Sequence, residues 1–537
     1  MTETGSELPP APEPVRRRAA IVLVVVAILV GVALIADVLA VPPPALPPEP
    51  VAQETPQAGA WYCPATAGEG ESAVLSVAAV GEDPSRVTVV RYPDREPAAD
   101  EPVDVAPGDE HTVILGPGEA TTPVSVRWEG GPAVASWRIE SGDTPGAPCE
   151  PGPAEIWHLA GLDTARGATS TVHLFNPFAT DAVARITFAT PEGRVALLLT
   201  DNLLVEAGTS ARIDLGEFQP EQPDLGATVE VLTGRLVAQG ELVLQPVGEQ
   251  GGPSGRALIP AASGPGALWS FGYARVDESS SSALSVVNTG DREAAVEVQV
   301  SNPRPEAGVQ EHSVAPGGVL TIDLAELSEE PEFGVSAQSV NDVPIVVHRV
   351  TTIDAEGREG LAVSRGAPLA TRWALVGAGT ADRRGRVLVY NPGVELVTVE
   401  VTTNGAVPDA WRGLEIPPNA WRSFSLVDAE PDRAQIPAMV AASGPVVAEL
   451  RSHHQSGALR LWTALGIRAE TWAGGGARPA VHRDPRLAIQ PLGAPAAERE
   501  GPAPLDPGEL PEVPGLDDDG GEPAPEGGEG QPPPDGG

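Results

Sequence analysis

Few residues of this chain stand at the spacings that enzymes use. The sequence has 74 Asp and Glu residues, so almost any two carboxylates could be taken for a glycosidase pair. Such a pair works only across a cleft, with the carboxyl groups about 5–10 Å apart, and spacing along the chain does not set that distance. Asp214 and Asp323 both lie in the tripeptide Ile-Asp-Leu, but the third copy of that stretch carries Ser425 instead. The carboxylates therefore predict no catalytic residue.

Other patterns typical of catalytic or ligand-binding sites are weak. The stretch GAGTAD at 377–382 has two of the three glycines of a dinucleotide-binding loop and lacks its strand–helix context, so we interpret it as a turn. Lone histidines such as His158 and His173 more often have a structural role than a metal-ligating one. The three aspartates at 517–519 lack the spaced ligands of a calcium loop. We predict no catalytic, cofactor-binding or metal-binding residue, and we expect that the protein is not an enzyme.

Cys63 and Cys149 are the only two cysteines. An even pair in an oxidising compartment favours a disulfide. A metal pair or a redox pair does not fit, because the spacing is far from Cys-x-x-Cys and no histidine lies beside either residue. We therefore predict a Cys63–Cys149 disulfide, provided that this part of the chain lies outside the cytoplasm. In the chain-entropy model so long a closed loop contributes about 4 kcal/mol.

A pattern of tryptophan and asparagine recurs along the middle of the chain. A tryptophan precedes an aliphatic run that ends in asparagine, and the spacing is constant within one residue. The pairs are Trp157 with Asn176, Trp269 with Asn288 and Trp373 with Asn391. An alternating run, a turn with its strand and a closing strand follow each pair in the same order. Four landmarks in constant order indicate a tandem repeat of about a hundred residues.

A divergent first copy precedes these three repeats. Trp61 occupies the tryptophan position, and GPAVASWRIE resembles the closing strand GPVVAELRSH of the last copy. The asparagine is replaced by Ala79, and the middle of the copy is shorter. The predicted repeats are residues 61–150, which the disulfide would close, 151–255, 256–360 and 361–480.

The repeats have the composition of β-strands. They alternate with a period of two, are rich in Val, Thr and Ile, and break at Gly, Pro, Asn and Asp every eight to twelve residues. We predict an all-β protein of tandem immunoglobulin-like β-sandwich repeats, with a single closed β-propeller as the alternative. The recurrent Asn would form a turn by tolerating left-handed geometry. The recurrent Trp would pack in a core or between domains.

The N-terminal part predicts a membrane anchor. Residues 1–18 form a polar start that ends in three arginines, and residues 19–41 are an apolar run long enough to cross a bilayer as one helix. The arginines place the N-terminus in the cytoplasm and the bulk of the chain outside the cell membrane. Residues 42–60 are a Pro-rich stalk. A cleaved signal peptide is the alternative, although the apolar run is longer than a usual signal core.

Charge and composition restrict the partners. The formal net charge is −40, which opposes binding to a phosphate backbone, so we predict no nucleic-acid partner. Residues 490–537 are mostly Pro, Gly, Asp and Glu. They cannot bury enough apolar surface to offset the entropy of ordering, so we predict a disordered acidic tail.

The order of these features resembles a known family. An anchor, a Pro-rich stalk, WYCP at 61–64 and then repeats with NP, PGG…IDL and PVVAE are similar to single-pass envelope proteins of unknown function from GC-rich actinobacteria. The resemblance covers about residues 61–470 and also extends to β-sandwich units of bacterial surface proteins. It implies an extracytoplasmic, non-enzymatic role beside a membrane glycosyltransferase or the cell wall, and it brings no catalytic residues.

Three functional hypotheses follow. The first is a membrane-anchored, extracytoplasmic scaffold or binding protein of the cell envelope, whose β-repeats bind a protein or a wall polysaccharide. The second is a carbohydrate-active hydrolase with an acidic cleft between repeats. The third is an accessory subunit of a membrane glycosyltransferase that acts through the transmembrane helix. Facing carboxylates and exposed Trp would favour the hydrolase, whereas buried landmark residues would favour the scaffold.

Overall fold

The recurrent alternation of the sequence builds β-sheets. In the strand Ala182–Thr190, Ala182, Ala184, Ile186 and Phe188 are buried while the residues between them are partly exposed. β-branched and aliphatic residues suit such a half-buried pleated surface. The computed structural model describes residues 58–471 apart from 94, 141–145, 248–251, 302–308, 329, 356–357, 382–383 and 454–460. All described sheets are antiparallel, and the fold is all-β.

The predicted cytoplasmic N-terminus (1–18), the transmembrane helix (19–41), most of the stalk (42–60) and the acidic tail (490–537) lie outside the described residues. Within the part of the chain that is described, no helix is long and apolar enough to cross a membrane.

The described strands fall into four β-sandwiches, which we number 1 to 4 along the chain. Sandwich 1 contains β1 (Ala58–Cys63), β2 (Ser72–Ala79), β3 (Ser85–Arg91), β4 (Ala98–Ala99), β5 (Val103–Val105), β6 (Glu110–Leu115), β7 (Val124–Gly130), β8 (Ala133–Glu140) and β9 (Gly146–Pro148). Sandwich 2 contains β10 (Ile156–Leu162), β11 (Ala168–Asn176), β12 (Ala182–Thr190), β13 (Gly193–Ala196), β14 (Leu203–Val205), β15 (Thr209–Asp214), β16 (Leu225–Thr233), β17 (Val237–Leu244) and β18 (Gly255–Pro260).

The other two sandwiches repeat this order. Sandwich 3 contains β19 (Leu268–Arg275), β20 (Ser280–Asn288), β21 (Ala294–Val300), β22 (Val309–Val314), β23 (Val319–Asp323), β24 (Glu332–Ser339), β25 (Ile345–Ala355) and β26 (Arg358–Arg365). Sandwich 4 contains β27 (Ala370–Leu375), β28 (Arg386–Asn391), β29 (Val397–Thr403), β30 (Leu414–Ile416), β31 (Ala420–Ser425), β32 (Ala438–His453), β33 (Leu461–Leu465) and β34 (Ile467–Arg468). Helices are restricted to the short α2 (Leu426–Ala429) and four single 3-10 turns among the described residues.

All four sandwiches share one topology. In sandwich 3 one sheet has the order β19-β24-β21-β22 and the other β23-β20-β25-β26, and the other sandwiches match it strand for strand. An immunoglobulin domain places its first strand beside the second and its seventh beside the sixth. Here the first strand pairs with the sixth and the seventh with the second. The repeats are therefore β-sandwiches in which the first and seventh strands have exchanged sheets relative to the immunoglobulin order, and in which the fourth strand pairs with the third.

Sandwich 4 shows how the sixth and seventh strands change sheet. They are one continuous 16-residue strand, β32. Its first part pairs with β27 and β29, and its second part pairs with β28 and β33. Gly444 and Pro445 lie between the two parts, where the strand passes from one sheet to the other.

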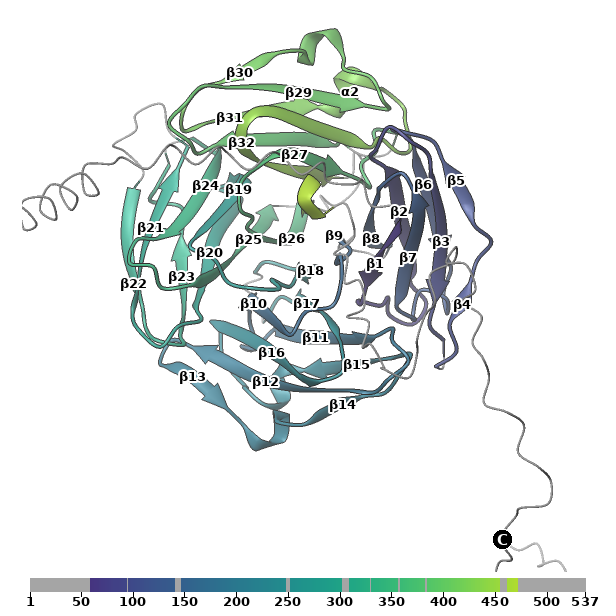
Figure 1. Ribbon diagram of the computed structural model, residues 1–537. Coiled ribbons are helices and arrows are strands. Elements are labelled where there is room, and N and C mark those ends of the chain that lie inside the picture. Colours follow the sequence, from purple (N-terminus) through teal and green to yellow (C-terminus); the bar gives the residue numbers. More distant parts are fainter. Residues whose placement is uncertain are drawn as a thin grey trace, which may run out of the picture. The chain divides into compact units, whose positions relative to one another are not determined.

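The four sandwiches close into a ring within one compact unit (Figure 1). In each sandwich the strand that pairs with the seventh-strand segment runs at the centre of the ring. We call these strands, β9, β18, β26 and β33, the axial strands. Each axial strand contacts the two beside it, and β33 of sandwich 4 contacts β9 of sandwich 1. The ring therefore joins the first sandwich to the last without a covalent bond.

Each sandwich has its own core between its two sheets. The described residues do not form the alternative β-propeller. A propeller blade is a single sheet, whereas each repeat here consists of two sheets. Closure into a ring is the feature that the two architectures share. The cores also interlock: Leu258 of sandwich 2 and Val376 of sandwich 4 pack into the core of sandwich 1.

Candidate functional site

The four tryptophans of the repeats, Trp61, Trp157, Trp269 and Trp373, are at most 5% exposed. We call them the landmark tryptophans. In every sandwich the indole N–H donates to the carbonyl at the start of the seventh-strand segment, at 2.7–3.2 Å. The acceptors are Ala133, Leu236, Ile345 and Val446. The tryptophan therefore fastens the first strand to the chain that crosses between the sheets.

The landmark asparagines, Asn176, Asn288 and Asn391, are also buried. The Nδ2 atom of Asn288 donates to the carbonyl oxygens of Arg292 and Val314 at 2.7 and 3.0 Å, and its Oδ1 atom accepts from the Gly290 N–H at 2.9 Å. The other two landmark asparagines repeat these bonds. Each side chain ties two turns to the end of the second strand.

The expected left-handed backbone at these asparagines is not present: none of the three has a positive φ. The side-chain amide, not the backbone conformation, is what the position requires. In sandwich 1 the position is Ala79, and there the turn is held by backbone bonds alone, from Ala79 to Asp109 and from Gly108 to Ala79. This explains how the first copy does without the asparagine.

The other residues considered in the sequence analysis make hydrogen bonds that stabilise the fold. Asp214 and Asp323 each accept a backbone N–H two residues ahead at 2.9 Å, so the recurring Ile-Asp-Leu ends a strand with a capped turn. His158 bonds Thr228, and His173 bonds the buried Glu241 at 2.8 Å. Among the described residues no group of three His, Cys, Asp or Glu could hold a metal ion.

The structure pairs Cys63 with Cys149 in a disulfide. Both cysteines are buried in the core of sandwich 1. Cys63 ends β1 and Cys149 follows β9, so the bridge joins the first strand to the axial strand. It also holds the next residue, Glu150, whose backbone pairs with that of Tyr62.

A polar side chain that sequence reasoning missed occurs at the same position of each seventh-strand segment. We call Ser136, Gln239, His348 and Glu449 the seam residues. Each lies opposite the axial strand of its own sandwich and bonds the preceding sandwich. The partners are Val376 O for Ser136, Ala65 N for Gln239, Pro260 O for His348 and Arg349 for Glu449.

Hydrogen bonds of the seam residues link each sandwich to the next around the ring. Three of them join a sandwich to its predecessor in the chain, and Ser136 of sandwich 1 joins it to sandwich 4 at 3.3 Å. A signal for them was present in the sequence. The segments VAS, VAQ, VVH and VAE each place a polar residue after two small or aliphatic ones.

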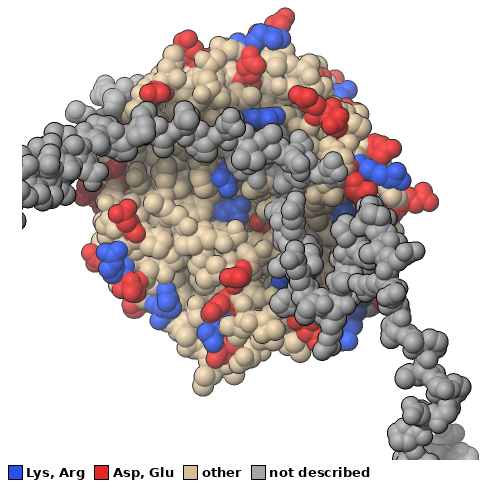
Figure 2. Space-filling model, in the orientation of Figure 1, with Lys and Arg blue, Asp and Glu red and all other residues tan. Residues whose placement is uncertain are grey.

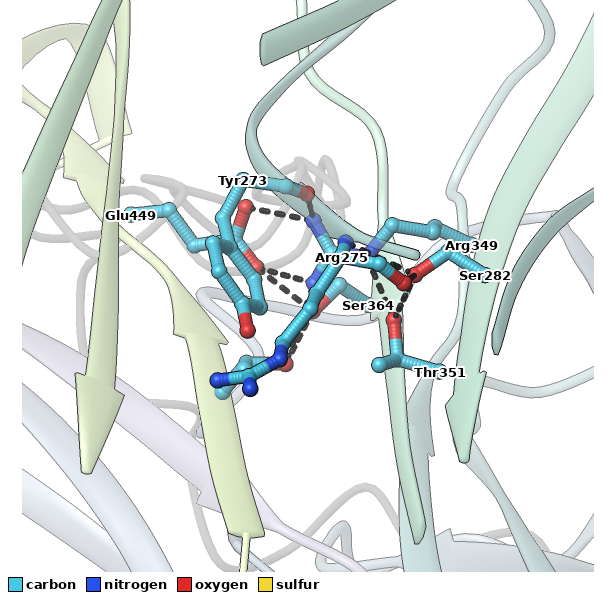
Figure 3. Close-up of polar contacts among 8 residues, drawn as sticks. Tyr273, Arg275, Ser282, Arg349, Thr351, Ser364 and Glu449 are labelled. Atoms are coloured by element: carbon cyan, nitrogen blue, oxygen red, sulfur yellow. Dashed lines mark hydrogen bonds and ion pairs between the residues drawn. The ribbon is translucent and has the colours of Figure 1, made fainter. Parts of the chain in front are cut away.

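A buried ion pair lies at the seam between sandwiches 3 and 4 (Figure 3). Arg349 and Glu449 are both fully buried, and the two guanidinium nitrogens donate to the two carboxylate oxygens at 2.9 and 2.6 Å. Arg349 also donates to the Tyr273 carbonyl and to Thr351, and Ser364 donates to Glu449 at 2.9 Å. These hydrogen bonds offset the free-energy cost of removing the two charged groups from water.

A second charged cluster joins sandwiches 1 and 2. Glu241 is buried and contacts His173 and Arg256, and Arg256 also donates to Glu71 of sandwich 1 at 2.7 Å. Burial acts to raise the pKa of Glu241, but the His173 hydrogen bond and the Arg256 charge outweigh it and lower the pKa to about 2.

A cavity of about 580 Å³ opens at the centre of the ring. We call it the axial cavity. Its described lining consists of residues at the ends of the four axial strands and in the segments that follow them, namely 148–154, 260, 262–264, 365–368, 465–468 and 471, together with Trp61, Trp157 and Trp269. Figure 1 places the last described residues near the centre of the ring, and Figure 2 shows basic side chains near the centre of the same view.

Glu150 is the one acidic residue in the described lining of the axial cavity. Its side chain is 2% exposed, and the nearest guanidinium nitrogen, of Arg365 from sandwich 3, is 3.6 Å away. Burial raises the pKa of Glu150 to about 7, which the Arg365 charge only partly opposes. Arg365 also donates to the Ala261 carbonyl, so it connects three sandwiches at the axis.

These features define an all-β protein in which four like sandwiches form a ring around a central cavity. Residues 130–365 match the family model DUF5719, a family of unknown function. The match runs from the start of the seventh strand of sandwich 1 through all of sandwiches 2 and 3. No curated protein matches the chain.

Proposed function

We propose that the protein is a non-catalytic scaffold or binding protein of the cell envelope, anchored in the membrane by residues 19–41 and raised by the stalk at 42–60. The ring is formed by sandwiches related to the immunoglobulin type. One observation carries the proposal: at one recurring position of the repeats, a seam residue bonds each sandwich to its neighbour and so closes the ring. A ring that joins its first and last sandwiches offers partners one stiff surface instead of a flexible string.

The buried landmarks favour the scaffold over the hydrolase. The landmark tryptophans have no exposed ring faces for a sugar. A glycosidase needs two carboxylates, and the described lining of the axial cavity supplies Glu150 alone.

The membrane topology can be tested with thiol labelling. The native cysteines are bridged, so a single added cysteine reports its own side of the membrane. We expect a membrane-impermeant maleimide to label Gln53→Cys in intact cells and to label Ser6→Cys only after lysis. Labelling of Ser6→Cys in intact cells would reverse the topology. Release of a soluble chain without the N-terminal residues would instead support the cleaved signal peptide.

The scaffold role can be tested by cross-linking. The full chain and a chain that lacks 61–480 are expressed in the same membranes, cross-linked mildly and recovered. We expect envelope proteins or wall polysaccharide to be captured by the full chain alone. Equal capture by both chains would place binding in the helix or the stalk, as the accessory-subunit hypothesis requires. Shortening of captured polysaccharide on incubation would favour the hydrolase.

A further inference from the structure

We propose that the axial cavity binds a short peptide segment with aliphatic side chains, whose amide groups bond Glu150 and Arg365. The inference rests on the scaffold function and specifies it, because it places recognition of a protein partner at the centre of the ring.

The size and walls of the cavity suit such a segment. Its volume of about 580 Å³ falls within the range of about 300–1,000 Å³ usual for small-ligand sites. The walls are largely proline, alanine and glycine, with Leu465 and Ile467 among them. Apolar walls of this kind gain free energy by covering aliphatic side chains, and the polar groups among them suit the amides of a peptide.

The polar groups supply one acceptor and one donor side by side. The backbone N–H and C=O of Glu150 are both bonded to Tyr62, so its carboxylate is the group left to face the cavity. At 3.6 Å, Arg365 is beyond the usual length of a charge-assisted hydrogen bond. A buried carboxylate with so distant a partner has lone pairs for a donor supplied by a ligand.

Arg365 complements this acceptor. A guanidinium has five N–H donors, and Arg365 gives one to the Ala261 carbonyl. An amide carries an N–H for Glu150 and a carbonyl oxygen for Arg365. A peptide amide therefore offers a partner to both groups, beside Arg468 as the second arginine of the lining.

A saccharide fits the same walls poorly. Sugars bind on exposed aromatic faces, but Trp61, Trp157 and Trp269 are 1%, 1% and 5% exposed. Ser263 and Thr471 are the only hydroxyl side chains among the lining residues that are described. The described lining therefore lacks the aromatic surface on which a sugar ring packs.

The test uses the full chain and defined probes. Acetylated and amidated tripeptides of Ala, Leu and Pro are titrated by calorimetry, and maltotriose is the saccharide probe. We expect a blocked tripeptide to bind and maltotriose not to bind. Glu150→Gln should weaken peptide binding roughly tenfold or more, since a hydrogen bond to a charged group is lost. Saturable binding of maltotriose with none of the tripeptides would overturn the proposal, as would no saturation by any tripeptide at millimolar concentration.

A substitution at an exposed residue beside the cavity can block the cavity without unfolding the protein. Ser263 lies at the cavity and is exposed, so Ser263→Trp fills the opening without disturbing a core and should abolish tripeptide binding. Ser210→Trp, at an exposed position of β15 outside the lining, is the matched control and should bind as the native chain does. Unchanged binding by Ser263→Trp would contradict the proposal. If Ser263→Trp still captures envelope partners as the native chain does, recognition lies on the outer surface; the cavity proposal then fails while the scaffold function stands.

Discussion

At the scale of single residues, the recurring side chains act as substitutes for backbone partners. Edges, turns and crossing points of a sandwich leave carbonyl and N–H groups that no neighbouring strand can satisfy. The landmark tryptophans and asparagines bond these groups in a buried setting. This is why the two residue types recur at constant spacing while the residues around them vary.

The asparagine role predicts a large effect for a small substitution. Asn288→Ala removes a side chain that makes four hydrogen bonds to buried or partly buried backbone. We expect the free energy of unfolding to fall by about 3 kcal/mol, because several carbonyls lose their partner at once. Denaturant unfolding measures the loss. The control Asn202→Ala, at an exposed asparagine, should change stability by less than about 0.5 kcal/mol. Equal effects of the two substitutions would argue against the role.

Glu150 predicts a particular pH dependence. Its pKa is raised by burial from 4.5 to about 7 in the folded protein, so the folded state binds the proton more tightly than the unfolded chain. The contribution of Glu150 to stability is therefore greatest below about pH 4.5 and falls as pH rises to about 7. Relative to the native chain, Glu150→Gln should gain about 2.5 kcal/mol of stability between pH 5 and pH 8.

Denaturant unfolding of the native chain and of the variant at pH 5 and pH 8 measures how their difference in stability changes with pH. Titration of other groups, such as the histidines, cancels between the native chain and the variant. A stability difference that stays constant from pH 5 to pH 8 would mean that Glu150 is not buried as described.

At the scale of strands and turns, the sequence predicted much of each repeat and little of how the repeats join. Alternation of aliphatic and polar residues shows which face of a strand is buried, so strands such as Val397–Thr403 and Ala294–Val300 could be anticipated. Alternation does not say which strands pair. The exchange of the first and seventh strands between sheets, and the continuity of β32, therefore had no signal in the pattern.

No pattern in the sequence predicted the axial cavity either. Glu150 and Arg365 come from sandwiches 1 and 3 and meet only when the ring closes. Arg349 and Glu449 likewise looked like ordinary strand residues, because an isolated acid or base in a strand is usually solvated. Their burial is a property of the seam between sandwiches.

The ion pair at the seam between β25 and β32 predicts strong energetic coupling between Arg349 and Glu449. Arg349→Met or Glu449→Gln alone leaves the remaining group buried and poorly compensated, so each should cost about 3–5 kcal/mol. The double variant should cost much less than the sum of the two, because no unpaired charge remains. Denaturant unfolding of the four proteins measures the coupling. Additive effects would show that the pair is exposed in solution.

A glycine at the same seam predicts a steric effect. A Cβ atom at Gly334 would lie 2.4 Å from the Tyr390 ring of sandwich 4. Gly334→Ala should therefore cost about 1–3 kcal/mol through overpacking. At Gly116, which has no neighbour within 4 Å of a Cβ position, the same substitution is the control and should be nearly neutral. The two thermal unfolding midpoints provide the comparison.

At the scale of the whole molecule, the ring must hold its first and last sandwiches together without a peptide bond. The seam between them uses a hydrogen bond from Ser136 to the Val376 carbonyl and a charge-assisted one from the Arg138 guanidinium to the Gly377 carbonyl at 3.0 Å. Sandwich 1 also carries the disulfide and lacks the asparagine. The bridge offsets the missing asparagine in the sandwich on which closure depends.

The disulfide predicts a measurable stabilisation. Its two cysteines are 86 residues apart, and the chain-entropy model gives about 4 kcal/mol for a loop of that length. The double variant Cys63→Ala, Cys149→Ala should be less stable by up to that amount. Reductant should destabilise the native chain and leave the variant unchanged. A native chain insensitive to reductant after full reduction would contradict the expected contribution.

Closure of the four sandwiches into one ring is the central claim, and small-angle X-ray scattering of residues 58–471 tests it most directly. A compact arrangement of that length has a radius of gyration of about 22 Å, whereas single sandwiches of about a hundred residues have about 13 Å each. A closed ring should therefore give a value in the low twenties of ångströms that does not change with salt. A radius near 40 Å, expected for four sandwiches of that size spaced along an open string, would show that the seams do not hold in solution.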